Sequence, residues 1–113
     1  MDILNEDFTS DWRSQSGYEP KTPAWRFMLG YQFGIAGKAL QGMHTNADYI
    51  LGAHLGHHRY QRHERKLNLA DPKCHPLMRN YATKVIPMLD KIIAMEEEHA
   101  LKYVPKVPAD PFL

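Results

Sequence analysis

The sequence has little cysteine, no long apolar run and no strong excess of either charge. Only Cys74 among its 113 residues is a cysteine, which excludes an internal disulfide framework and a zinc site built from several thiolates. No apolar run approaches the roughly 20 residues that a membrane-spanning helix needs, so we expect no membrane association. The N-terminal residues are acidic, whereas targeting peptides are basic at this end. These absences favour a cytoplasmic protein.

The sequence also lacks the motifs of the common enzyme classes. It contains no glycine-rich phosphate loop, no candidate Ser-His-Asp set and no metalloprotease helix. Cys74 stands next to His75, but neighbours along a chain rarely present both side chains to one reacting atom. We therefore expect no enzymatic activity and no cofactor.

The net charge of +1 conceals a basic middle region. Between residues 24 and 69, six lysines and arginines stand against two acidic residues, and five of the seven histidines lie there too. A polyanionic partner is therefore expected to bind this region. The apolar content of 43% is enough for one modest core.

Glycines at helical spacing mark the first predicted helix, which runs from residue 24 to about residue 41. Each glycine costs about 1 kcal/mol relative to alanine in a helix interior, so we expect a second backbone to approach closely there. A second predicted helix ends near residue 67 and carries two matching glycines. The sequence thus predicts an antiparallel helical hairpin over residues 24–67. The predicted helix-packing residues are Gly30, Gly34, Gly37, Gly52 and Gly56.

A third long helix is predicted over residues 76–103, after a proline-containing linker. Pro87 lies inside it and should kink or split it. Its apolar residues recur at helical spacing and predict one buried stripe. The stripe consists of Met78, Tyr81, Ala82, Val85, Ile86, Leu89, Ile92 and Ile93. The predicted fold class is therefore all-α, with a single helical domain over residues 24–103.

Irregular arms flank this predicted domain. Residues 1–23 form an extended acidic arm, and residues 104–113 form a proline-rich tail. Phe8, Trp12 and Phe112 would leave large apolar surfaces in water if the arms were free. One alternative function is thus a structural subunit or protein inhibitor whose arms wrap a larger protein assembly. Arms folded on their own helices would count against it.

The second predicted helix ends in a basic stretch that contains one aromatic residue. This composition suits phosphate contacts and base stacking, although a solvated helix face has it too. Arg59, Arg62 and Lys66 fall on one face of the helix. The candidate nucleic-acid-binding residues are His58, Arg59, Tyr60, Arg62, Arg65 and Lys66.

Two pairs of residues have the spacing of metal ligands. His54 and His58 stand one turn apart on the second predicted helix, and Glu96 and His99 stand three residues apart on the third. Only one Glu-x-x-His unit is present, whereas a di-iron site needs more carboxylates. Histidines hydrogen-bonded to neighbours are the simpler interpretation, and residues 96–98 are expected to be a solvated charge run. We expect no bound metal, and a helical metal-binding protein is the second alternative.

Four short segments that contain glycines, histidines and basic residues lie between residues 26 and 62. They keep the order and spacing of a known family pattern, with no insertion between them. They are Gly30-Tyr31-Gln32, Gly34-Ile35-Ala36-Gly37-Lys38, His54-Leu55-Gly56 and His58-Arg59. This set resembles the ribosome modulation factor family. The resemblance implies a two-helix hairpin that binds the small ribosomal subunit near the end of its RNA and promotes inactive ribosome dimers.

The chain departs from this family pattern at two places. His54 and His58 stand where the family has tryptophans, and Met43-His44-Thr45 replaces its cysteine-proline-tyrosine turn. With the resemblance, the leading functional prediction is a small non-enzymatic protein that uses the basic end of its second helix to bind RNA or the ribosome and modulate its activity.

Overall fold

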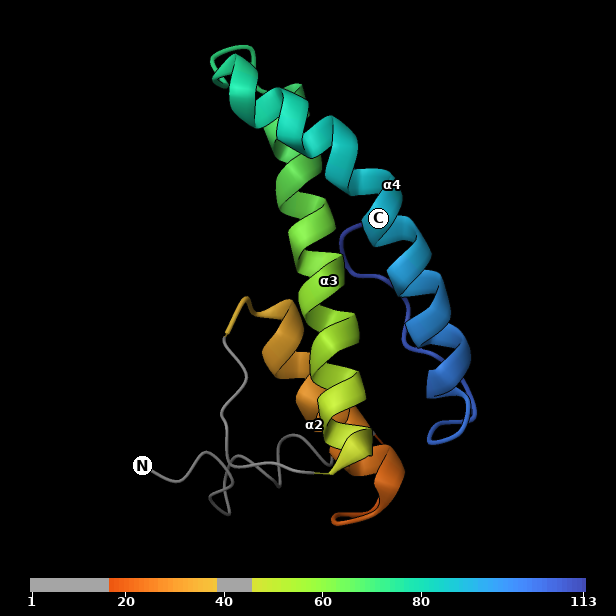
Figure 1. Cartoon of the computed structure of the whole chain (residues 1–113). Coiled ribbons are helices and arrows are strands. Elements are labelled where there is room, and N and C mark those ends of the chain that lie inside the picture. The colour runs from red at the N-terminus through yellow and green to blue at the C-terminus, as the bar shows by residue number, and fades with distance from the viewer. Residues whose placement is uncertain (1–16, 39–45) are drawn as a thin grey trace.

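The computed structural model describes residues 17–38 and 46–113, which form three α-helices and no strand (Figure 1). The helices are α2 (Pro23–Ile35), α3 (Ala47–Ala70) and α4 (Pro76–Ala100). The all-α prediction is confirmed for these residues, and none of the three helices is long and apolar enough to cross a bilayer. Phe8, Trp12 and the Met43-His44-Thr45 segment lie outside the described residues.

Side-chain caps and prolines begin two of the helices. The Thr22 hydroxyl accepts a hydrogen bond from the Trp25 backbone N–H at 3.2 Å, and Pro23 occupies the first turn of α2. At the start of α4, Nδ1 of His75 accepts from the Leu77 backbone N–H at 3.1 Å. These local signals place both helix starts where the sequence predicts them.

A glycine ends α2 earlier than predicted. Gly37 has a φ of 74°, in the left-handed region. The backbone N–H groups of Gly37 and Lys38 donate to the carbonyls of Gly34 and Phe33 at 3.0 and 3.2 Å, which is the Schellman pattern. The helix therefore ends at Ile35, and Gly37 is its stop signal rather than an interior residue.

Glycines lie where the backbones of α2 and α3 meet. A Cβ built on Gly34 would stand 2.6 Å from the His57 nitrogen and 2.9 Å from the Gly56 carbonyl carbon, and one built on Gly30 would strike the Tyr49 carbonyl oxygen. The two glycines of α3 meet backbone atoms of α2 in the same way. Because the obstructing atoms are backbone, no side chain fits at these positions without moving a helix.

The order of these contacts shows that α2 and α3 run in the same direction. Gly30 lies against Tyr49 and Gly34 against Gly56, so residue numbers rise together along both helices (Figure 1). The predicted antiparallel arrangement is therefore wrong. The number of residues between the two helices permits the parallel arrangement, because 11 residues can span about 36 Å, more than the about 20 Å length of α2.

The antiparallel pair is instead α3 and α4. Ion pairs join Arg62 to Asp90 at 2.8 Å and Arg59 to Glu97 at 2.7 Å. Residue numbers therefore rise along α3 while they fall along α4. The helix α4 is continuous through Pro87, and Figure 1 shows it changing direction along its length. An interior proline causes such a bend because it removes one backbone hydrogen bond.

Two apolar clusters form the core. The larger cluster joins all three helices to the C-terminal tail, and its buried members are Phe27, Tyr31, Leu55, Leu89, Ile93, Ala100 and Val104. The smaller cluster lies between α2 and α3 and contains Trp25, Leu29, Tyr49 and Ala53. Although α2 has only 13 residues, it contributes to both clusters.

The tail folds back between α3 and α4 (Figure 1). Asp110 accepts a hydrogen bond from Nη2 of Arg62 at 2.7 Å. The ring of Phe112 stacks on His63 with centroids 4.7 Å apart. Phe112, a predicted partner-binding residue, therefore contacts its own chain, which counts against an arm that wraps another protein at this end.

Replacing Asp110 by alanine should lower the free energy of unfolding by about 2 kcal/mol. Its side chain is 4% exposed and also accepts from the Phe112 backbone N–H at 2.9 Å, and a hydrogen bond to a charged group contributes about 1.5–3 kcal/mol. Asp90→Ala is the matched control, because Asp90 pairs with the same guanidinium but is 53% exposed. It should cost less than about 1 kcal/mol. Urea denaturation measures the free energy of unfolding of both variants. If the two variants lose the same free energy, the tail is not anchored through Asp110.

Candidate metal centre

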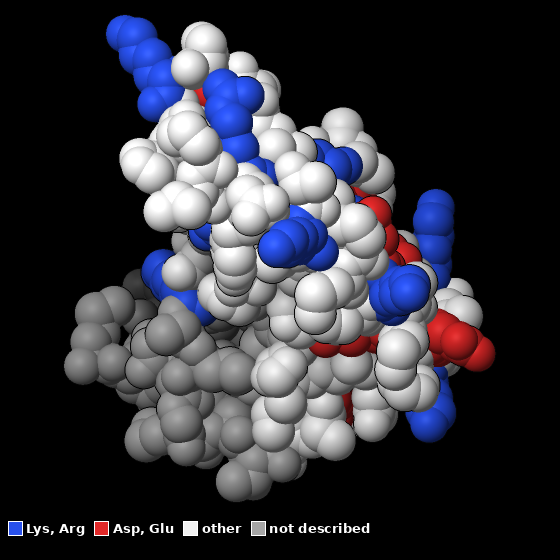
Figure 2. Space-filling model, turned by 45° about the horizontal axis from the view of Figure 1, so that its top comes forward, with Lys and Arg blue, Asp and Glu red and all other residues white. Residues whose placement is uncertain are grey.

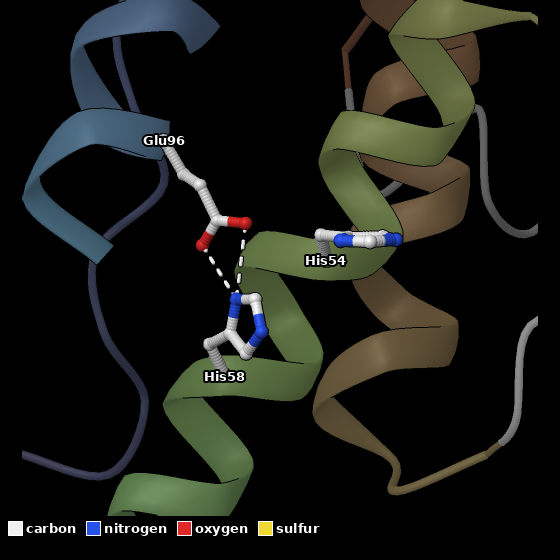
Figure 3. Close-up of side chains that lie close together, drawn as sticks. All are labelled: His54, His58 and Glu96. Carbon is white, nitrogen blue, oxygen red and sulfur yellow. Dashed lines mark hydrogen bonds and ion pairs between the residues drawn. The ribbon is translucent and has the colours of Figure 1, made fainter. Parts of the chain in front are cut away.

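Three potential metal ligands, two on α3 and one on α4, lie close together (Figure 3). His54 and His58 stand one turn apart and therefore on the same side of α3. Glu96 points from α4 towards His58, whereas the ring of His54 extends away from Glu96. One donor atom from each of the three side chains lies within 4.8 Å of the others. Two imidazoles and one carboxylate thus share one small volume.

Glu96 is held by His58. Nδ1 of His58 lies 2.8 Å from Oε1 and 3.0 Å from Oε2 of Glu96, and Glu96 is only 9% exposed. A buried carboxylate needs a partner because its desolvation is costly. In Figure 3 the other ring nitrogen of His58 lies on the side away from Glu96. Nδ1 of His58 is therefore the ring nitrogen that faces the carboxylate.

The spacing of the three donors approaches that of a metal site. Donors about 2.0–2.2 Å from a tetrahedral zinc ion lie about 3.3–3.6 Å from one another, somewhat farther apart than His58 and Glu96, which are 2.8 Å apart at their nearest donor atoms. The largest separation allowed between donor atoms of the three side chains, 4.8 Å, is longer than the spacing of ligands around a zinc ion. His54 is exposed, so its side chain would have to turn towards the other two donors to share a metal with them. The same donor set occurs in catalytic zinc sites and in non-haem iron sites.

A pocket of about 320 Å³ adjoins the cluster. Most of its surface is apolar, and it shares His54 and His58 with the metal-ligand cluster. Its lining residues are Phe33, Lys38, Tyr49, Ala53, His54, His57 and His58. A metal held by the two histidines would therefore lie at the wall of a cavity that accepts a small molecule.

His57 gives the pocket a third imidazole. Its Nδ1 atom is buried without a hydrogen-bond partner among the described residues. Burial lowers the pKa of His57, and the neighbouring His58 and His54 lower it further. His57 is consequently a neutral group at neutral pH.

The predicted RNA contact Arg59 is buried inside the protein. It is 2% exposed, and its guanidinium donates to the Tyr31 hydroxyl at 2.8 Å, the Pro108 carbonyl at 2.7 Å and the Glu97 carboxylate at 2.7 Å. The helix face that it shares with Arg62 packs against α4 and the tail. As placed, Arg59 is therefore not accessible to a phosphate.

The other predicted RNA contacts are dispersed. Arg62 is paired with two carboxylates, Arg65 lies over the Tyr81 ring at 5.3 Å, and Tyr60 meets the Phe112 ring edge at 6.3 Å. Lys66 is exposed. On the face drawn in Figure 2, lysine and arginine side chains are scattered over a mostly uncharged surface. The basic residues of α3 thus stabilise the fold to a large extent.

The structure separates the two residues of the Glu-x-x-His unit. Glu96 faces α3, whereas His99 is exposed and lies outside the donor cluster. Glu96 and Glu97 both bond to side chains of α3, so the predicted solvated charge run is wrong for these two residues. Glu98 is exposed as predicted. The pairing of Glu96 with His58 across 38 residues had no signal in the sequence beyond the spacing of the histidines.

No protein-family model matches the chain, no curated protein matches it, and no solved structure matches it. The resemblance of residues 26–62 to the ribosome modulation factor family therefore stays a prediction.

Proposed function

We propose that this chain is a helical metal-binding protein whose ligands are His54, His58 and Glu96. The observation that supports the proposal is the convergence of two imidazoles and a carboxylate from two helices, with one donor atom of each within 4.8 Å of the others. Nitrogen and carboxylate donors suit a divalent transition metal such as zinc. The sequence prediction of no bound metal is revised by this proposal.

The packing of the helices supports the position of these ligands. The residues next to His58 and Glu96 along the chain are Arg59 and Glu97, which form an ion pair at 2.7 Å. This pair fixes how far α4 has slid along α3. The glycine contacts between α2 and α3 hold α3 from its other side. We infer that the two helices present the ligands from a rigid frame, as a metal site requires.

Three protein ligands leave a coordination position open. A tetrahedral zinc ion with two histidines and one glutamate has one further position for water or a small molecule. The adjacent pocket has room for such a molecule. The proposed activity is therefore reversible binding of the metal together with an exchangeable ligand. His58 and Glu96 would have to give up their mutual hydrogen bond to hold a metal ion, which would supply Lewis acidity to the adjoining pocket.

Isothermal titration with zinc chloride tests the proposal. We expect one zinc ion per chain, and we expect His54→Ala and His58→Ala each to weaken binding at least about 10-fold, since each removes one of only three ligands. His99→Ala is the matched control, because His99 is an exposed histidine outside the cluster and its loss should leave the affinity unchanged. Equal affinities for all four proteins would refute the site.

RNA or ribosome binding, the leading prediction from the sequence, stays a prediction. Of its residues Arg59 is buried and His58 is bonded to Glu96, so no specific contact favours it as a second function.

A further inference from the structure

The helix α4 carries more apolar surface than its own chain covers. Buried residues of α4 include Ala82, Leu89 and Ile93. Three members of the predicted buried stripe are nevertheless exposed, because one face of α3 and a short tail cover only part of the helix. The large exposed side chains of α4 include Met78 at 42%, Tyr81 at 53%, Met88 at 60%, Ile92 at 37% and Met95 at 59%.

These exposed residues follow a heptad repeat. Together with the half-buried Val85 and the exposed His99 they are spaced by three and four residues in strict alternation, from residue 78 to residue 99. This spacing defines a continuous seam along a helix and is the pattern of two-stranded coiled coils. At about 100° per residue, the seam lies roughly a quarter turn from the face that packs on α3. We call Met78, Tyr81, Val85, Met88, Ile92, Met95 and His99 the α4 seam.

We propose that the α4 seam binds the same seam of a second copy of this chain, with the two helices antiparallel. In this register Ile92 packs against Met88 of the second copy, and Val85 packs against Met95. A two-fold axis relates the copies, so every contact occurs twice and the interface is closed. Apolar stripes of this length on a soluble helix mark interaction surfaces.

The charges beside the seam favour a second copy in the antiparallel orientation. The outer flank carries Lys84, Lys91 and Glu98, all exposed. In the antiparallel register Lys84 of each copy faces Glu98 of the other, which gives two opposite-charge pairs. Lys91 of one copy lies opposite Lys91 of the other near the two-fold axis. Salt screens the repulsion between these exposed charges.

A parallel pair lacks this complementarity. It would bring Lys84 opposite Leu89 of the second copy and Lys91 opposite Glu96. Leu89 is buried in the core and Glu96 is held by His58. The exposed lysines would thus lose their opposite charges, so the antiparallel register is the one that the surface specifies.

Sedimentation equilibrium of the full chain tests the dimer. We expect a mass twice the 13.1 kDa of the chain. Ile92→Glu should weaken association at least 100-fold, because it buries a carboxylate between apolar side chains. Leu101→Glu is the matched control, since Leu101 is 57% exposed and lies off the seam. A circular dichroism melt of each variant checks that it folds. A monomeric parent chain, or a folded Ile92→Glu variant that still dimerises, would overturn the proposal.

Disulfide formation tests the orientation. In a Cys74→Ser background, Met88→Cys mixed with Ile92→Cys should give a cross-linked heterodimer on mild oxidation, and Met88→Cys alone should cross-link much more slowly. Rapid cross-linking of Met88→Cys to itself would mean a parallel pair and would contradict the proposed register.

Discussion

Replacement of Gly34 by leucine should lower the melting temperature of the protein by more than about 10 °C. A Cβ at this position would already stand 2.6 Å from a backbone nitrogen of α3, and it would also strike the Ala53 carbonyl oxygen. Backbone atoms cannot rotate aside as a side chain does, so α2 must move away from α3. Overpacking of this kind costs about 3 kcal/mol or more, and each kcal/mol shifts the melting temperature by roughly 4 °C in a chain of this size.

Ala36→Leu provides the control for Gly34→Leu. It introduces the same leucine two residues further along, at an exposed position just after α2, and should change the melting temperature by no more than a few degrees. Circular dichroism melts of the two variants measure the difference. If Gly34→Leu has the same melting temperature as the parent protein, then α2 does not pack on α3 through its glycines.

Replacement of Arg59 by methionine should cost about 3 kcal/mol of stability. Methionine retains the apolar stem but removes the donors to the Pro108 carbonyl and the Tyr31 hydroxyl. Truncating one partner of a buried, hydrogen-bonded charge costs about 3–5 kcal/mol. The estimate is taken at the lower end because the partner carboxylate of Glu97 is 40% exposed and can regain water.

Arg65→Met is the matched control for Arg59→Met. Arg65 is a partly exposed arginine of the same helix that lies over the Tyr81 ring, and an exposed cation–π contact contributes about 0.5–1 kcal/mol. The free energies of unfolding of the two variants, measured by urea denaturation, should therefore differ by at least about 2 kcal/mol. Equal losses would mean that Arg59 is not the internal link between α3, α4 and the tail. The same result would restore Arg59 as a candidate for contacts outside the chain.

Local signals in the sequence predict the helices but not their arrangement. Pro23 and Pro76 begin two helices where expected, because prolines act within one turn. The relative direction of α2 and α3 depends on which glycines meet, and Gly30 and Gly34 suit parallel or antiparallel packing equally well. A pattern on one helix cannot reveal the direction of its mate.

The candidate site could be predicted in part. The spacing of His54 and His58 places both on one face, and its spacing from His99 makes Glu96 a candidate ligand. The sequence could not predict that Glu96 would meet His58, because that contact depends on how far α4 slides along α3. The burial of Arg59, a predicted RNA contact, could not be foreseen for a similar reason. A basic residue near a helix end looks solvated until the chain that covers it, here the tail at Pro108, is known.

X-ray absorption spectroscopy of the zinc-loaded chain tests the central claim most directly. The account predicts two imidazole nitrogens and carboxylate oxygen in the first coordination shell, at about 2.0–2.2 Å from the metal. It also predicts that His54→Ala loses one of the two imidazole signals. A shell made of water and carboxylate oxygens alone, or a spectrum that His54→Ala leaves unchanged, would contradict the metal centre formed by His54, His58 and Glu96.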